Sequence, residues 1–432
     1  MLEKSFKKII SIYKKRSLTY KNLIQLISSS VFVQLIAFLT TPLLTRIYSP
    51  SDFGKFASYL SLITIFSVIS TLRYELAIVV PTKDKKAKIL VLLCFILILI
   101  TFSLLLLFGL VQINNSFIFS KNNSIREIYW FIPFGILFSG IIQPFKYYSI
   151  RDKLFLFISK LQIKQSLFGV FVTIISFKLG FSGLILGQLS NIFIGILGFT
   201  NLLGEKIFSI LPIKKKAIKK VASEYKNYAL FSTSSGLVNT FGVQVPYLLL
   251  LVTFGSEQLG YLYLAEKLLR APLNLICTSI EKVFIGIAPE YFRKGDMLKI
   301  INKTYIKLLA MNICVGAVLT LILPLIISPI FGSNWENVSK IILIILPMTL
   351  IDFTVSTLSM SFEIIKKPEN GLYAQISLSL IRMIPFCFPI LRSDFTNLLI
   401  FYSIASSFGY ISYYFFLKRS VYLSDKILIN LN

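Results

Sequence analysis

A long run of apolar residues without a charge constrains this chain more than any other feature. From Ile89 to Val111 the sequence reads ILVLLCFILILITFSLLLLFGLV, which exceeds the roughly 20 residues that an α-helix needs to cross the hydrocarbon core of a bilayer. Similar runs recur along the chain, and 55% of its residues are hydrophobic. Because lipid does not tolerate unpaired backbone groups, such runs predict spanning helices. We therefore expect an all-α polytopic membrane protein.

The apolar runs and the residues that interrupt them predict about twelve membrane helices. Their expected ranges are 21–45, 54–77, 87–111, 127–150, 157–178, 182–203, 227–251, 257–283, 303–328, 337–363, 371–391 and 395–417. These ranges define a six-helix N-terminal lobe at 21–203 and a six-helix C-terminal lobe at 227–417. A basic N-terminal segment (1–20), a basic linker (204–226) and a tail (418–432) complete the expected organisation.

Lysine and arginine alternate between the two sides of the predicted bundle. Every second loop, starting with the N-terminal segment, is basic, whereas the loops between them carry few cations. Because basic loops stay in the cytoplasm, we expect both termini there. The same distribution explains the net charge of +26 through membrane insertion and contact with anionic lipids. Nucleic acid is therefore not an expected partner.

The two halves of the chain open with similar segments. Residues 20–56 begin YKNLIQLISSSVFVQLIAFLTTP, and residues 225–263 begin YKNYALFSTSSGLVNTFGVQVP. Each segment carries an amide, Gln34 or Asn239, ahead of a proline, Pro42 or Pro246. Six helices return a chain to its starting side, so the halves are expected to be parallel repeats around an axis along the membrane normal. Convergence of helix starts through composition is the alternative.

Several classes of chemistry are not expected. The chain contains no histidine, and its four cysteines lie in apolar runs without metal-binding or disulfide spacing. It has no G-x-x-x-x-G-K-[ST] phosphate loop, so ATP hydrolysis by this chain is not expected. We predict no metal, no cofactor and no catalytic residue.

Three stretches carry a resemblance to a known family. They are LLTRIYSPSDFGKFASYLSLITIFSVISTLRYELAIVVP, LGYLYLAEKLLRAPLNLICTSIEKVFIGIAPEYFRKGD and LPLIISPIFGSNWENVSKIILIILP. With the helix layout, they resemble the Wzx-type polysaccharide-biosynthesis flippases of the multidrug/oligosaccharidyl-lipid/polysaccharide (MOP) exporter superfamily. The resemblance implies two six-helix bundles in a V around a central cavity.

The resemblance also implies a substrate and partners. Such a protein would carry a polyprenyl-pyrophosphate-linked oligosaccharide from the inner to the outer leaflet of the bacterial cytoplasmic membrane, for O-antigen, capsule or another surface polysaccharide. Membrane lipids, a polysaccharide polymerase and a chain-length regulator are the further partners expected from it.

Charges at bilayer depth are costly and mark candidate functional residues. Lys267 and Arg270 are three positions apart on one helix face near mid-depth, where they would attract a pyrophosphate or an acidic sugar. The alternative is an internal Glu266–Arg270 pair with Lys267 reaching toward the interface. Glu266 is also a candidate for ion coupling.

Two more charges fall near mid-depth, and two lie at a helix end. Asp352 and Arg382 form either a structural ion pair or a functional set in which Asp352 binds a coupling H⁺ or Na⁺ and Arg382 contacts substrate. Arg73 and Glu75 lie near the expected cytoplasmic interface. There they are topological anchors, unless Arg73 meets the head group as it enters.

Polar side chains of the opening helix of each half are candidates for contacts with sugar. They are Gln34, Asn239, Ser235 and Gln244. Amides and hydroxyls bind sugars, but the same groups also form packing hydrogen bonds between membrane helices.

The alternatives to a flippase are a drug antiporter and a membrane enzyme. A cation-coupled drug antiporter of the same superfamily needs an acidic cavity, whereas the mid-depth charges here are mostly cationic. A membrane polymerase or ligase is expected to carry a long external loop with catalytic Arg or His, and no such loop is predicted. The sequence therefore favours a transporter over an enzyme.

Overall fold

The computed structural model describes residues 18–114 and 123–431, and these residues form helices and no strand. Most of the predicted basic segment 1–20 lies outside the described residues. The α-helices are α2 (Leu18–Ile47), α3 (Pro50–Ser70), α4 (Tyr74–Ala77), α5 (Asp84–Asn114), α6 (Asn123–Tyr129), α7 (Phe131–Arg151), α8 (Phe155–Ile175), α9 (Phe181–Phe208), α10 (Lys215–Glu224), α11 (Thr233–Arg293), α12 (Met297–Ile326), α13 (Val338–Ser356), α14 (Ser361–Ile364), α15 (Pro368–Met383) and α16 (Phe395–Leu431).

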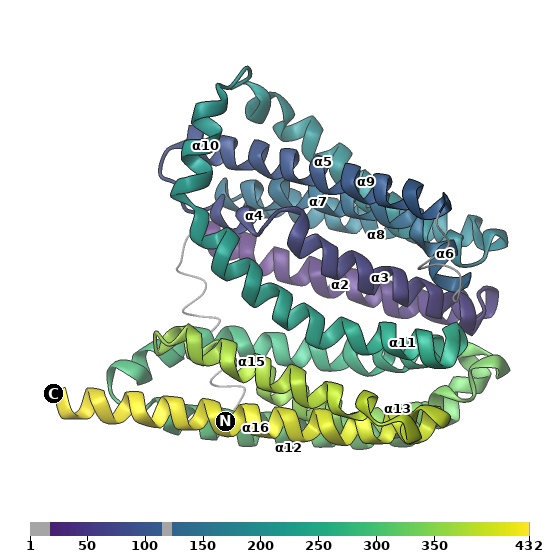
Figure 1. Cartoon of the computed structure of the whole chain (residues 1–432). Helices are drawn as coiled ribbons and strands as arrows, with labels where there is room; N and C mark the ends of the chain where they lie inside the picture. Colours follow the sequence, from purple (N-terminus) through teal and green to yellow (C-terminus); the bar gives the residue numbers. More distant parts are fainter. Residues whose placement is uncertain (1–17, 115–122, 432) are drawn as a thin grey trace. The chain divides into compact units, whose positions relative to one another are not determined.

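α11 consists of two arms joined at a sharp turn (Figure 1). Gly255 makes the turn with φ 84° and ψ 178°, a conformation that only glycine adopts readily. It lies between two helices that the sequence separates, 227–251 and 257–283. The twelve predicted helices therefore correspond to α2, α3, α5, α7, α8, α9, the two arms of α11, α12, α13, α15 and α16.

Ten of the described segments are long and apolar enough to cross a membrane. One of them, 228–274, takes in both arms of α11, and the 16-residue α15 is not among them. α15 ends at Met383, two residues before Pro385, and a 3₁₀ turn follows at Ile384–Cys387. The predicted fold class, an all-helical polytopic membrane protein, is confirmed.

The chain divides into two compact units. Of the described residues, unit 1 comprises 18–40, 66–114 and 129–233, and unit 2 comprises 41–65, 123–128 and 234–431. The core of unit 1 gathers side chains from α4, α5, α7, α8, α9 and α10. In the α8–α9 pair, a Cβ on Gly195 would lie 1.6 Å from Nε2 of Gln165. Small residues therefore allow these two helices to approach closely.

The predicted linker packs onto unit 1. Its helix α10 buries Val221 in the core, and Lys86 of α5 forms an ion pair with Glu224 at 2.6 Å. The hydroxyl of Tyr74 donates to the carbonyl of Ala222 at 3.0 Å. The linker is therefore a folded part of this unit.

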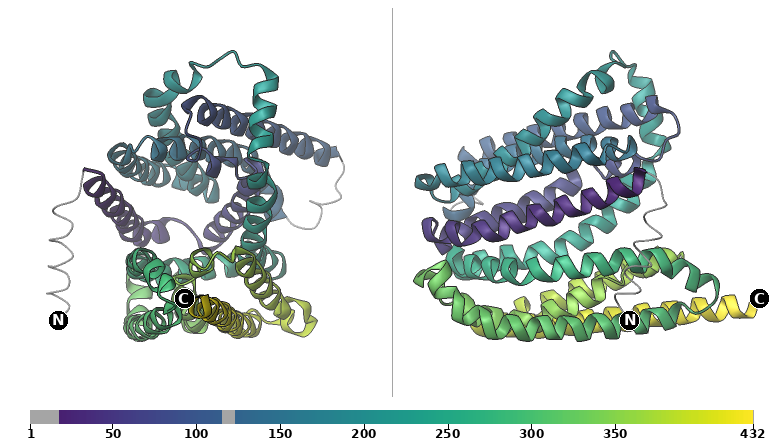
Figure 2. Two further views of the ribbon diagram at one scale, coloured as in Figure 1. Left: turned by 90° about the vertical axis from the view of Figure 1, so that its left-hand side faces the viewer. Right: turned by 180° about the vertical axis from the view of Figure 1, so that it is seen from behind.

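Unit 2 is built around α16, which contacts α12, α13 and α15 (Figure 2). The predicted tail 418–432 continues α16 as a helix to Leu431 and buries Val421 in the core. The start of α3 also belongs to this unit and meets the second arm of α11. A Cβ on Gly54 would lie 1.7 Å from the carbonyl oxygen of Ser256, so only glycine fits there.

Candidate functional site

A polar cavity lies inside unit 2, between the two arms of α11 and helices α13, α15 and α16. Its volume is about 210 Å³. The lining residues are Asn239, Val243, Tyr247, Glu266, Arg270, Met348, Thr349, Asp352, Ser356, Gln375, Leu378, Arg382, Tyr402 and Tyr410. Most of the predicted charged residues of the C-terminal half therefore meet at one place.

The guanidinium of Arg270 joins two carboxylates in this cavity. Its Nε donates to Oε2 of Glu266 at 3.1 Å, and its Nη2 donates to Oδ2 of Asp352 at 3.3 Å. The Glu266 contact spans one turn of α11, which is the i,i+4 pair that the sequence analysis gave as the alternative to substrate binding by Arg270. The Asp352 contact links α11 to α13. Ser356 donates to Oδ1 of Asp352 at 2.7 Å, so this carboxylate is held from two sides.

Arg382 enters the cavity from α15 and forms no ion pair with a carboxylate in the described part of the chain. Its side chain is 5% exposed, and its Nη2 donates to the hydroxyl of Tyr410 on α16. The guanidinium also lies over the Tyr410 ring, 4.5 Å from its centroid. Its Nε is buried and has no hydrogen-bond partner among the described residues. Arg382 is therefore the cation of this cavity with unused hydrogen-bonding capacity.

The predicted structural pair between Asp352 and Arg382 is not formed in the described part of the chain. Asp352 pairs with Arg270 instead. Tyr410 lies close enough to both Asp352 and Arg382 to interact electrostatically with each. Which cation a carboxylate meets is decided by the rotation of α13 against its neighbours, and the position of Asp352 in the sequence does not contain that information.

The cavity is less cationic than the sequence suggested. Its lining holds two cations, Arg270 and Arg382, and two carboxylates, Glu266 and Asp352. Lys267, which was expected to act with Arg270, is half-buried outside the lining. The structure shows no hydrogen bond or ion pair to it from any described residue. The five predicted mid-depth charges therefore divide into a balanced set of four and a separate lysine.

The predicted sugar-contacting residues do not gather at one place. Asn239 lines the cavity, and its Oδ1 accepts a hydrogen bond of 2.9 Å from Nε2 of Gln375. Ser235 is exposed and Gln244 is half-buried, and neither lines the cavity. Gln34 belongs to unit 1, where its amide oxygen is buried without a described partner. Arg73 also belongs to unit 1.

Sequence reasoning missed several residues of the lining. They are Gln375, Ser356 and the tyrosines Tyr247, Tyr402 and Tyr410. A tyrosine within an apolar helix has the same pattern as a core residue, so the sequence carried no signal for these rings. Gln375 lies about two helical turns before Arg382 on α15, so both side chains lie on the same face of the helix. That spacing was the available sign that Gln375 shares a site with Arg382.

Comparisons with known proteins agree on the fold. A family model described as "Polysaccharide biosynthesis protein" matches residues 43–340. The chain is similar in structure to the lipid II flippase MurJ in an inward closed conformation, with a TM-score of 0.68, 14% identity and coverage of 94% of this chain and 91% of that one. No curated protein sequence matches it.

A second similar fold is that of multidrug resistance MATE family transporters of the MOP superfamily. An inward-facing structure has a TM-score of 0.63, with 13% identity and coverage of 91% of this chain and 96% of that one. An outward-facing structure has a TM-score of 0.60, with 13% identity and coverage of 95% and 98%. Since the family model matches more than half of the chain, the protein belongs to the polysaccharide biosynthesis protein family, and its fold is similar to that of MurJ and of the MATE transporters.

Proposed function

We propose that this protein is a flippase for polyprenyl-pyrophosphate-linked oligosaccharide repeat units. It moves them from the inner to the outer leaflet of the bacterial cytoplasmic membrane, for O-antigen, capsule or another surface polysaccharide. The family supports a role in polysaccharide biosynthesis. One observation carries the proposal further: a buried arginine, Arg382, lines a polar cavity and pairs with no carboxylate of the described residues.

The cavity suggests how an anionic sugar-lipid is held. Arginine binds phosphate through parallel hydrogen bonds, and Arg382 has a free Nε donor for this purpose. Asn239 and Gln375 supply the amide groups that sugar hydroxyls require. Gln34, Ser235 and Gln244 act as further sugar contacts along the path. Lys267 and Arg73 attract the head group outside the cavity, with Arg73 at the entry end.

Glu266 and Asp352 supply a route for coupling. Arg270 carries one positive charge and contacts both carboxylates, so the three groups together are anionic and repel a pyrophosphate. A proton or Na⁺ on Asp352 or Glu266 removes that repulsion and lets Arg270 join Arg382 in phosphate binding. Ion binding would thus favour the loaded state of the cavity, and ion release would favour release of the head group during alternating access.

The same cavity favours one alternative, a cation-coupled multidrug antiporter. Two carboxylates and three tyrosine rings line it, and this combination also binds organic cations. The MATE fold is compatible with either function. In the alternative, a cationic ligand pairs with Glu266 and Asp352, whereas in the proposed function an anionic ligand pairs with Arg382.

Loss of the protein in cells separates these functions. The flippase proposal expects the polyprenyl-linked repeat unit to accumulate in the cytoplasmic leaflet after depletion, with loss of surface polymer. Leaflet position is measured by labelling the glycan in intact and in permeabilised cells. Normal polymer with altered drug sensitivity would contradict the flippase and support the antiporter.

The proposal includes a membrane topology and two protein partners. We place both termini on the cytoplasmic side, on the evidence of the basic loops. A polysaccharide polymerase and a chain-length regulator act on the product in the outer leaflet. The transport itself requires no covalent step.

A further inference from the structure

The chain breaks sharply after α3, at residues that do not favour a break. Leu72 has φ 47° and Arg73 has φ 56°, so two consecutive non-glycine residues lie in the left-handed region. Each such residue costs about 1–2 kcal/mol. Strain of this kind persists only where the surrounding structure imposes it, and it gathers at functional sites.

Unpartnered polar atoms are concentrated at the same break. Oγ1 of Thr71, Nε of Arg73 and Oε2 of Glu75 are buried and have no hydrogen-bond partner in the part of the chain that the structure describes. Thr71 is 2% exposed and Glu75 is 6% exposed. A buried polar group without a partner costs about 1–3 kcal/mol. Three such atoms within five residues of a strained turn therefore require an explanation beyond packing.

Glu75 differs in this respect from the two carboxylates that line the cavity of unit 2. Glu266 and Asp352 each contact a guanidinium within 3.3 Å, whereas the structure shows no ion pair to Glu75 from any described residue. The ionisable groups that interact with Glu75 are Arg73, Cys94 of α5 and Tyr147 of α7. Of these, only Arg73 is a cation.

The environment of Glu75 favours its neutral form. Cys94 is fully buried beside it, and α4 packs into the apolar core of unit 1. Burial raises the pKa of the Glu75 carboxyl, and the Arg73 charge offsets this only in part. The titratable residue of the other segment against α4, the π-turn at 228–232, is Tyr228.

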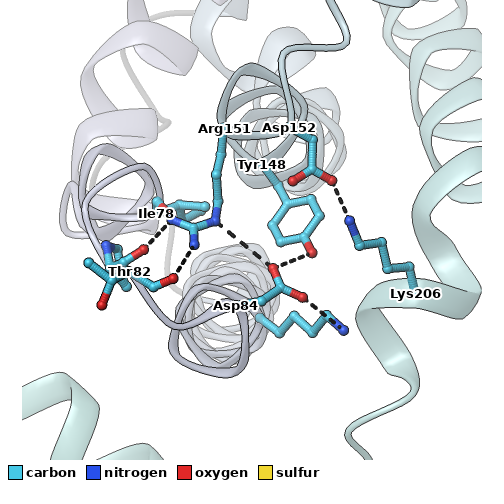
Figure 3. A network of polar contacts seen from close by, with 9 residues as sticks. Ile78, Thr82, Asp84, Tyr148, Arg151, Asp152 and Lys206 are labelled. Carbon is cyan, nitrogen blue, oxygen red and sulfur yellow. Dashed lines mark hydrogen bonds and ion pairs between the residues drawn. The ribbon is translucent and has the colours of Figure 1, made fainter.

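The segment that follows Glu75 is held firmly. Figure 3 shows Arg151 of α7 donating to the carbonyls of Ile78 and Thr82, at 3.5 and 3.3 Å. The hydroxyl of Tyr148 donates to Oδ1 of Asp84 at 2.8 Å and so ties the start of α5 to α7 (Figure 3). Because this side is anchored, a rearrangement near Glu75 must occur at the strained turn Thr71–Arg73.

We propose that Glu75 is a proton-binding site of unit 1. The carboxyl group holds a proton in the conformation described above. When the turn at Thr71–Arg73 relaxes, the O–H bond breaks, the proton passes to water, and the carboxylate that remains pairs with the Arg73 guanidinium. Proton binding is argued from the burial of the Glu75 carboxyl and from its unpartnered Oε2. Its use in coupling rests on the proposed flippase function, and adds a second titratable site to the one considered in unit 2.

The direct test is infrared difference spectroscopy on the purified full-length protein in lipid nanodiscs. We expect wild type to keep the carbonyl stretch of a protonated carboxylic acid at pH values above the ordinary glutamate pKa of about 4.3, where exposed carboxyl groups are ionised. Glu75→Gln should lose that band. Glu205→Gln, which changes an exposed glutamate of the same unit, should keep it.

A Glu75→Gln spectrum identical to that of wild type would overturn the proposal. If Glu75→Gln does not fold, Glu75→Asp provides the same test, because its band should move in frequency, and an unmoved band would refute the site. For coupling, flipping of a fluorescent polyprenyl-pyrophosphate oligosaccharide is measured in proteoliposomes with and without a pH gradient. Glu75→Gln should flip at a rate that the gradient no longer changes.

The two proposals fail in different ways. Absence of flipping by wild type, with the band present, removes the flippase function and leaves the proton site. A gradient response that survives in Glu75→Gln removes the coupling role of Glu75 and leaves the flippase.

Discussion

Removal of Arg270 gives the sharpest test of the cavity, because its guanidinium contacts two carboxylates. Its Nε lies 3.1 Å from Glu266 and its Nη2 lies 3.3 Å from Asp352. Loss of one partner of a fully buried ion pair costs about 3–5 kcal/mol. The side chain of Arg270 is 37% exposed, so solvent screening reduces our expectation for Arg270→Gln to about 2–4 kcal/mol.

Stability and transport together distinguish a structural role from substrate binding. The triple variant Arg270→Gln, Glu266→Gln, Asp352→Asn removes all three charges and should recover stability to within about 1 kcal/mol of wild type, since neutral replacements of buried ion pairs are often tolerated. Stability is measured by denaturation in mixed micelles, and transport by flipping in proteoliposomes.

If Arg270 binds the pyrophosphate, the triple variant is stable but does not transport, and Arg270→Lys keeps part of the activity. Arg270→Gln alone is the control for destabilisation, because it leaves both carboxylates without their cation. Transport at the wild-type rate by the stable triple variant would refute the reasoning, and would assign Arg270 a structural role only.

Four further predictions follow from other parts of the molecule. Gly54→Ala should lower the unfolding free energy by about 1–3 kcal/mol, because its Cβ would lie 1.7 Å from a backbone oxygen. Gly204 has open space around it, so Gly204→Ala should be neutral or stabilising in the same denaturation assay. Tyr148→Phe should cost about 1–2 kcal/mol through loss of its hydrogen bond to the carboxylate that opens α5, and an unchanged stability would show that this bond contributes nothing. The raised pKa of Glu75 means that the folded state binds more protons than the unfolded state above about pH 4.3. The free energy of unfolding should therefore fall as pH rises toward the raised pKa and level off beyond it. Glu75→Gln should flatten that dependence on pH, and a dependence that persists in this variant would be evidence against the shift. Reporter fusions should place both termini on the same side of the membrane, and fusions that report opposite sides would contradict the predicted topology.

The sequence predicted the helices well because a membrane helix is a local property. The uncharged run Ile89–Val111 lies wholly within α5, and the glycine between the seventh and eighth predicted helices, Gly255, makes the turn of α11. Burial in lipid requires each spanning segment to satisfy its own backbone and to be apolar over its length, so both conditions appear in a window of about 20 residues. The contact between Glu266 and Arg270 was predictable for the same reason.

What the sequence could not determine is which distant side chains meet. Arg270 reaches Asp352 across 82 positions, while Arg382 turns to Tyr410, and both choices depend on how α11, α13, α15 and α16 are rotated about their axes. A helix that is apolar on all sides carries almost no record of that rotation in its pattern. The buried state of Glu75 depends likewise on α5 and α7, which close over the break after α3. The local apolarity of the sequence thus determined the number and positions of the membrane helices. Side-chain packing between the helices decided which charged residues share a cavity.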